Sequence, residues 1–196
     1  MKPYKILSIL ILIPLLLICG CSNNKPITEE SILQKADEVL DKGEAESAIE
    51  YNNFILGAQA KVINGMLALN WDASSEAFNL EIENLIQLLN TILENVNSID
   101  TYKHGKDFKE ALKEQLYMYK DIAKNDFLEI FELQNKSPTS DEEIKELSSK
   151  IDAIYKRIEE KETPIDIKVN NAQIEFAKRH NLKLHATELQ EKLDNL

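Results

Sequence analysis

The chain has 196 residues, of which 34 are acidic and 23 are lysine or arginine, so its formal net charge is −11 at pH 7. Nucleic acids and anionic lipid surfaces both attract basic patches, so this acidic balance argues against either of them as a partner. Only five glycines and five prolines are present. This scarcity of turn residues predicts few elements, each long and helical, in one domain of common size.

The N-terminal segment carries Lys2 and Lys5 ahead of an uncharged apolar run at residues 6–18. A positive start followed by an apolar run of about 7–15 residues is typical of a secretory signal peptide. The run is shorter than the roughly 20 apolar residues that a membrane-spanning helix requires. We therefore expect residues 1–20 to be a signal peptide that is absent from the mature protein.

The signal segment ends with an aliphatic residue, two small residues and a cysteine: Ile18, Cys19, Gly20 and Cys21. This motif resembles the lipobox of bacterial lipoproteins. The resemblance implies cleavage between Gly20 and Cys21 and diacylation of the Cys21 thiol, and Ser22 in place of aspartate implies the outer membrane. Two or three acyl chains hold a protein firmly in a bilayer, whereas one holds it marginally. The lipid bilayer is thus the expected partner of Cys21.

The two cysteines have other interpretations, which the sequence makes weaker. A Cys-x-Cys pair can bind a metal ion, but no histidine or further cysteine lies near enough to complete four ligands. A disulfide between residues two apart would be strained, and the chain offers no third cysteine as a partner.

Apolar residues recur in steps of three and four through four long segments, as the buried face of a helix requires. The clearest stripe extends over three heptads and consists of Phe78, Ile82, Leu85, Leu89, Ile92, Val96 and Ile99. Together with three short turns, this pattern predicts an all-α, up-down-up-down four-helix bundle. Residues 21–28 are expected to form a short lipidated tether, residues 29–182 the bundle and residues 183–196 a C-terminal tail.

Several residues predict where these helices begin and end. Gly105 is the expected left-handed residue of the second turn, and Asn181 is the expected left-handed residue after the last helix. Ser140, three residues before Glu143, fits a capping box. Pro164 lies where a helix is expected to kink or restart.

The sequence holds no motif that predicts catalysis. The Glu-x-x-His pair of di-metal bundles is absent, because no acid lies three residues before His104, His180 or His185. The motifs of zinc peptidases, α/β-hydrolases and P-loop enzymes are absent as well. We therefore expect no enzyme, no cofactor and no metal site.

Charge is scarce in the first two long helices. Only Lys61 is charged between residues 51 and 71, and only Glu94 between residues 84 and 99. Tight packing around small residues explains such a pattern, and so does a biased use of asparagine. The alternative is an uncharged partner-binding face, since interface cores are depleted in charge. Its candidate residues are Tyr51, Asn53, Asn64, Trp71 and Asn90.

A second resemblance concerns the mature domain. The phrases "TYKHGKDF", at residues 101–108, and "FAKRHNL", at residues 176–182, look like segments of uncharacterised helical surface lipoproteins of leptospiral type. In that family the turn has the form Tyr-Lys-x-Gly-Asp, from which Lys106 departs as an insertion. The resemblance implies a helical fold and an envelope location, and it implies no activity.

The sequence is compatible with two functions. In the first, the bundle is a non-enzymatic interaction or structural module that Cys21 anchors at the cell envelope, with an unknown protein partner and an open oligomeric state. In the second, the bundle holds a small apolar molecule between its first two long helices. A charge-poor pocket lined by Asn53, Asn64 or Asn90 would favour the second function, and a closed interior would disfavour it.

Overall fold

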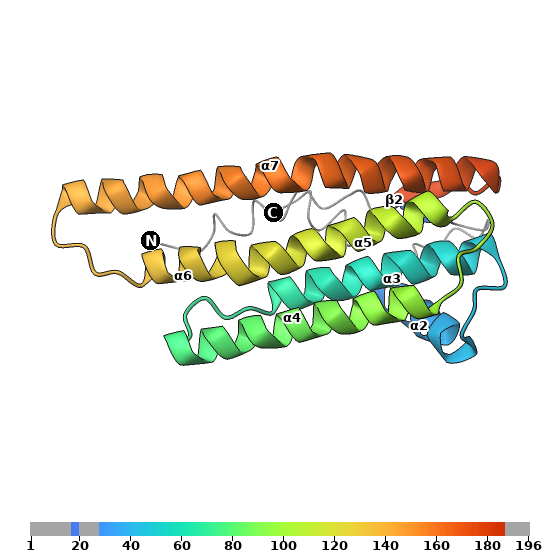
Figure 1. Cartoon of the computed structure of the whole chain (residues 1–196), viewed down its shortest axis with the longest axis horizontal. Coiled ribbons are helices and arrows are strands. Elements are labelled where there is room, and N and C mark those ends of the chain that lie inside the picture. Colours follow the sequence, from blue (N-terminus) through green and yellow to red (C-terminus); the bar gives the residue numbers. More distant parts are fainter. Residues whose placement is uncertain (1–16, 20–27, 187–196) are drawn as a thin grey trace.

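The structure, a computed structural model, describes residues 17–19 and 28–186, and most of these residues are helical (Figure 1). The helices are α2 (Glu29–Lys42), α3 (Ala48–Leu67), α4 (Ser75–Ser98), α5 (Lys106–Asp121), α6 (Leu128–Gln134) and α7 (Asp141–Arg179). A π-helical segment, η2 (Ile122–Phe127), joins α5 directly to α6. Two short strands, β1 (Leu17–Cys19) and β2 (Leu184–Ala186), pair antiparallel. The predicted all-α class is therefore confirmed, with one small strand pair added.

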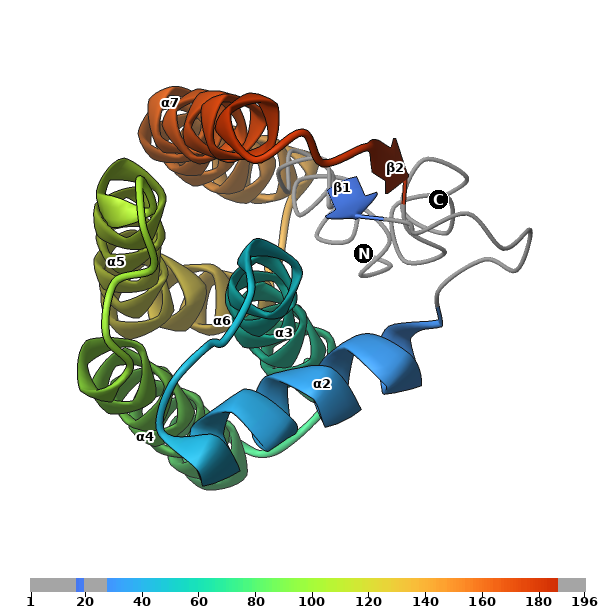
Figure 2. The ribbon, with the colours of Figure 1, turned by 90° about the vertical axis from the view of Figure 1, so that its right-hand side faces the viewer.

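Four helical rods lie side by side along the long axis of the molecule: α3, α4, the joined α5–η2–α6 and α7 (Figure 1). The shorter α2 crosses α3 and α4 instead of following them (Figure 2). Its approach to α3 depends on Gly57, because a Cβ at this position would collide with the Cβ of Ala36. An ion pair of 2.6 Å between Lys61 and Asp37 lies beside this close contact.

The helix starts follow from hydroxyl side chains. Thr28, Ser47, Ser74 and Ser140 each accept a hydrogen bond from the N–H three residues further on, which satisfies one donor of the first turn. The predicted pairing of Ser140 with Glu143 is half formed. The Glu143 carboxylate accepts the N–H of Thr139, at 2.6 Å, and not that of Ser140.

The predicted stripe of α4 lies in the core, where all seven of its residues are at most 4% exposed. In α3, by contrast, the ten consecutive residues 51–60 are all buried. Such burial around the whole circumference is typical of a central helix and not of a surface helix with one apolar face. In this fold α3 lies between α2, α4 and α5, and β1 lies beside it (Figure 2).

The second turn differs from its prediction in one residue. The left-handed residue is His104, with φ of 62°, whereas Gly105 has φ of −91°. Glycine is needed at position 105 for space, because a Cβ there would press against the ring of Tyr51. Asn181, with φ of 55°, is left-handed as predicted.

The last helix does not restart at Pro164, one of the two outcomes expected there. α7 continues through Pro164 without ending, over 39 residues. A proline inside a helix removes the hydrogen bond to the carbonyl four residues earlier, which here belongs to Glu160. Both Pro164 and Glu160 lie on the exposed side of α7, where water can take the place of the missing donor.

The strand pair connects two segments that the sequence places outside the bundle. Leu17 pairs with Ala186, Ile18 with His185, and Cys19 with Leu184. The backbone of the predicted signal peptide therefore contacts the start of the predicted tail in the full chain. Gly20 and Cys21, the predicted cleavage and lipidation residues, lie outside the described residues.

Candidate functional site

The two aromatic candidates of the predicted partner face lie near opposite ends of α3. Tyr51 is 1% exposed, donates a hydrogen bond of 3.3 Å to the carbonyl of Gly105 and lies 5.5 Å from Phe176 between ring centroids. This burial raises the pKa of the Tyr51 phenol well above its usual range. Trp71 is half-buried near the turn between α3 and α4, and its ring packs against Phe78 at 4.9 Å.

The three asparagines of the predicted face are not grouped either. Asn53 is 2% exposed, inside the molecule. The amide of Asn64 donates to Glu29 at 2.6 Å, and Asn90 accepts from Lys120 at 2.7 Å. The structure therefore does not bring the five residues together on one surface.

The low charge of α3 and that of α4 have different structural settings. In α3 the neutral polar residues Asn52 and Gln59 are buried, so the lack of charge accompanies burial. On α4 four exposed residues are uncharged, Leu80, Asn84, Gln87 and Thr91, and the exposed carboxylates Glu83 and Glu94 flank them. Unlike the buried amides of α3, these side chains are accessible to another molecule. We call these four exposed residues the α4 face.

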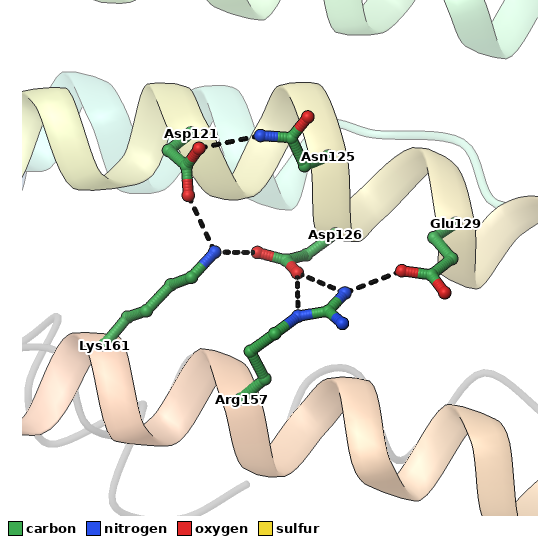
Figure 3. Close-up of polar contacts among 6 residues, drawn as sticks. All are labelled: Asp121, Asn125, Asp126, Glu129, Arg157 and Lys161. Carbon is green, nitrogen blue, oxygen red and sulfur yellow. Dashed lines mark hydrogen bonds and ion pairs between the residues drawn. The ribbon is translucent and has the colours of Figure 1, made fainter.

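A network of ion pairs connects the π-helical segment to α7 (Figure 3). Its centre is the carboxylate of Asp126, whose side chain is 1% exposed and which accepts from Arg157 and Lys161, each at 2.7 Å. Arg157 also binds Glu129 at 2.6 Å, and Lys161 also binds Asp121 at 2.7 Å. Because Arg157 binds one oxygen of this buried carboxylate and Lys161 binds the other, the network connects the two rods.

The exposed members of the network have shifted pKa values that match this geometry. The hydrogen bond from Lys161 lowers the pKa of the Asp121 carboxyl. Hydrogen bonds to Glu129 and Asp126 raise the pKa of the Arg157 guanidinium. Every ionised group of the network thus has an oppositely charged partner.

A second group of buried polar side chains lies between α3, α5 and α7, and we call it the interior polar cluster. Gln59 donates to Gln115 at 2.8 Å, and Gln115 donates to Asp166 at 2.9 Å. Glu162 lies one turn before Asp166 on α7, and Tyr119 lies one turn after Gln115 on α5. All five residues are at most 6% exposed.

The acids of the interior polar cluster have no cationic partner among the ion pairs of residues 28–186. Burial, with the nearby Asp166 and Glu159, raises the pKa of Glu162 to about 8. Burial also raises the pKa of Asp166 to about 7, against the hydrogen bond from Gln115 that lowers it. Burial and the two carboxyl groups raise the pKa of the Tyr119 phenol well above its usual range.

This arrangement can exchange protons near neutral pH or accept a cationic group. One oxygen of Glu162, one oxygen of Asp166 and the Tyr119 hydroxyl are buried without a hydrogen-bond partner. Buried charges in proteins are normally paired or bind a cation, so a positively charged group would satisfy these acids. The interior polar cluster is therefore the candidate binding site of the molecule.

Sequence reasoning missed this site. Acidic residues of a helix ordinarily face solvent, whereas Glu162 and Asp166 point into the interior. A signal was present, because Glu162 lies four residues after Ile158 and therefore continues the apolar stripe of α7.

The histidines occupy the end of the molecule where α7 finishes. The Nε2 atom of His180 lies 2.7 Å from the carbonyl oxygen of Lys103, and its ring centroid lies 5.9 Å from that of His104. Within residues 28–186 no group of three or more histidine, cysteine or acidic side chains is placed to hold a metal ion. Nor does any described helix have the length and apolarity that crossing a membrane requires.

Comparisons with known proteins give no relative from which a role could be transferred. No protein-family model, no curated protein and no solved structure matches the chain.

Proposed function

We propose that the chain is a lipid-anchored protein of the bacterial cell envelope, most consistent with the outer membrane, that acts as an interaction or structural module without catalysis. In this proposal Cys21 is acylated after removal of residues 1–20, residues 21–28 form the tether and residues 29–182 form an up-down-up-down four-helix bundle. The lipobox-like residues 18–21 support the anchor. The side-by-side rods support the bundle (Figure 1).

The observation that carries the interaction role is the α4 face. Leu80 is 57% exposed, and Asn84, Gln87 and Thr91 are exposed on successive turns of residues 84–91, which contain no charge; the exposed Glu83 and Glu94 flank them. The outer surface of α7, in contrast, carries exposed charges such as Lys156 and Glu160. A neutral surface is less costly to desolvate than a charged one, which is why interface cores are depleted in charge.

The anchor is tested by substituting each cysteine separately. Cys21→Ser should abolish acylation and leave the chain uncut or released from the membrane fraction. Cys19→Ser is the matched control, because serine keeps a small residue at that position of the motif, and this variant should still be acylated and membrane-bound. Mass spectrometry and detergent partitioning measure both outcomes, and unchanged partitioning of Cys21→Ser would contradict the anchor.

The partner surface is tested by photocrosslinking in the native envelope. A benzoylphenylalanine in place of Gln87 should give one discrete crosslinked adduct, whereas the same group in place of Lys156 should not. Equal crosslinking from both positions would show that the α4 face has no special role.

The hollows between α3 and α4 do not match an apolar ligand held by the expected asparagines. The cavity where α2, α3 and α4 meet measures about 10 Å³, which barely admits one water molecule. A second hollow, of about 200 Å³, lies between the C-terminal end of α3 and α4, and its lining includes Gly65, Leu69 and Asn84 but none of Asn53, Asn64 and Asn90. Asn64 and Asn90, two of the expected lining residues, bind Glu29 and Lys120 instead.

A further inference from the structure

One side of α3 points neither to α2 nor to α5. Gly57 and Lys61 point to α2, and Gln59 points to α5. Successive residues of a helix are rotated by about 100°, so a separate stripe lies between these two directions. Its members are each at most 3% exposed: Asn53, Leu56, Ala60 and Ile63.

The matching side of α7 carries polar residues at helical spacing. Glu162, Asp166, Asn170 and Gln173 follow one another in steps of four, four and three. The amide of Gln173 donates to Asn52 of α3 at 3.0 Å, so the two helices face each other across this region. We call these two stripes together the α3–α7 groove.

Unpaired polar atoms are concentrated in this groove. Six buried side-chain atoms of residues 28–186 have no hydrogen-bond partner, and five of them belong to α3 and α7. They are Asn52 Nδ2, Asn53 Oδ1, Glu162 Oε2, Asp166 Oδ2 and Asn170 Oδ1. Buried polar groups are rarely left unpaired, and such a concentration indicates a surface shaped for another occupant.

In the full chain an extended segment already lies at the groove. β1 is beside α3, and it pairs with β2, which follows α7 after a short turn (Figure 2). β1 belongs to residues 1–20, the predicted signal peptide. Its removal would leave β2 without its strand partner and would free the part of α3 beside which β1 lies.

We propose that the α3–α7 groove of the processed protein binds an extended peptide segment of a partner protein, which adds a strand to β2 and places a lysine or arginine beside Glu162 and Asp166. The inference rests on the proposed function, because β2 loses its strand partner β1 only when residues 1–20 are cleaved.

Two features specify this occupant. Strand addition supplies backbone hydrogen bonds, and β2 already accepts a strand in this way. A basic side chain supplies the missing positive charge, as Arg157 and Lys161 do for Asp126 in the same pair of rods. The apolar residues Leu56 and Ile63 would cover the neighbouring side chains of the peptide.

The first experiment uses the protein expressed from the whole sequence and purified from membranes in detergent. Its intact mass shows whether residues 1–20 have been removed, which tests the proposed function alone. The probe for the groove is a fluorescein-labelled heptapeptide of alternating leucine and threonine with a central lysine, compared with the same peptide containing glutamate. The processed protein should bind the lysine peptide at least tenfold more tightly in fluorescence anisotropy.

Variants connect this preference to the groove. Glu162→Gln combined with Asp166→Asn should abolish the preference, whereas Glu160→Gln, on the exposed side of α7, should preserve it. Equal binding of both peptides, or no binding to processed protein, would overturn the inference. The inference would also be overturned if palmitate displaced the lysine peptide and bound equally well to the double variant. The groove would then be a site for acyl chains.

The second experiment does not depend on processing. In Cys21→Ser protein whose intact mass shows that residues 1–20 are retained, Leu184→Cys places a thiol opposite Cys19, and facing Cα atoms of antiparallel strands are close enough for a disulfide. Mild oxidation should link the introduced cysteine to Cys19, and Lys183→Cys should not react in the same way. This chain should not bind the lysine peptide. If the disulfide does not form, strand addition to β2 is contradicted, even when the wild-type protein is processed normally.

Discussion

Two buried acidic sites lie along the same pair of rods, α5–η2–α6 and α7, and they differ in how their charge is compensated. Asp126 has two cationic partners, Arg157 and Lys161, at 2.7 Å each. Glu162 and Asp166 have a single hydrogen bond from Gln115 and no cation among the described ion pairs.

The difference shows two solutions to the same physical problem. A buried carboxylate is unfavourable unless it is paired or neutralised by a proton. The Asp126 network uses pairing, with the heads of its cations partly exposed at the surface. The interior polar cluster holds protons instead, since the pKa values of Glu162 and Asp166 are about 8 and about 7. The Asp126 network contributes to stability, whereas the interior polar cluster is able to accept a cationic group.

The largest expected effect is on the paired site. Asp126→Asn keeps the shape of the side chain but removes the charge that Arg157 and Lys161 share. We expect the free energy of unfolding to fall by about 2–4 kcal/mol, at the lower part of the range for buried pairs because both cations can regain water. Urea denaturation of the purified full chain measures it. A loss below about 1 kcal/mol would show that the network is not a major stabilising contact.

The interior polar cluster should make the stability of the protein fall as pH rises. The ordinary pKa values are 4.5 for Glu162 and 3.8 for Asp166, below the folded values of about 8 and about 7. Between about pH 4 and pH 8 the folded state therefore holds more protons than the unfolded state, so stability is highest below this window and falls as pH rises through it.

The double variant Glu162→Gln, Asp166→Asn tests this dependence in the uncut Cys21→Ser chain. It should flatten the decline and should raise the free energy of unfolding by about 1–3 kcal/mol at pH 8, because neutral amides carry no charge to desolvate. A variant that is less stable than its parent at pH 8 would mean that the acids are compensated there.

A smaller effect is expected at Tyr119. Tyr119→Phe removes a buried hydroxyl that has no hydrogen-bond partner, so nothing favourable is lost with it. The free energy of unfolding should change by roughly 0–1 kcal/mol towards greater stability. Thermal unfolding measures this change, and a clear loss would reveal an important bond to that hydroxyl.

The smallest effect belongs to the exposed edge of the Asp126 network. Glu129→Gln removes an ion pair with Arg157 in which both side chains are about half exposed. Surface pairs of this kind contribute roughly 0–1 kcal/mol, so this variant should be nearly indistinguishable from the parent in urea. A loss of unfolding free energy as large as that of Asp126→Asn would show that the exposed Glu129 contributes as much as the buried Asp126.

Much of the fold could be predicted from the sequence because its signal is local. The 4-3 spacing from Phe78 to Ile99 fixes one face of α4 whatever lies against it, and hydroxyl residues fix the helix starts. The burial of residues 51–60 could not be predicted in the same way, since it depends on what surrounds α3.

The misplaced details have the same origin in tertiary contacts. Gly105 is small because the Tyr51 ring lies over it, and this contact joins residues 54 positions apart. α7 continues through Pro164 because that residue faces outwards. The acids of the interior polar cluster were missed since charge predicts exposure in a single sequence, and only the packed structure shows Glu162 and Asp166 inside.

The close contact of Gly57 with α2 has a consequence for the whole protein. It fixes α2 against α3, and therefore fixes Thr28, where α2 begins, relative to all four rods. Seven residue steps separate Thr28 from Cys21, so a fully extended chain between them reaches about 25 Å. An acylated Cys21 would confine the domain to a thin layer beside the bilayer, where the local concentration of membrane-bound partners is far higher than in bulk. Within such a layer, even a weak peptide contact would be occupied most of the time.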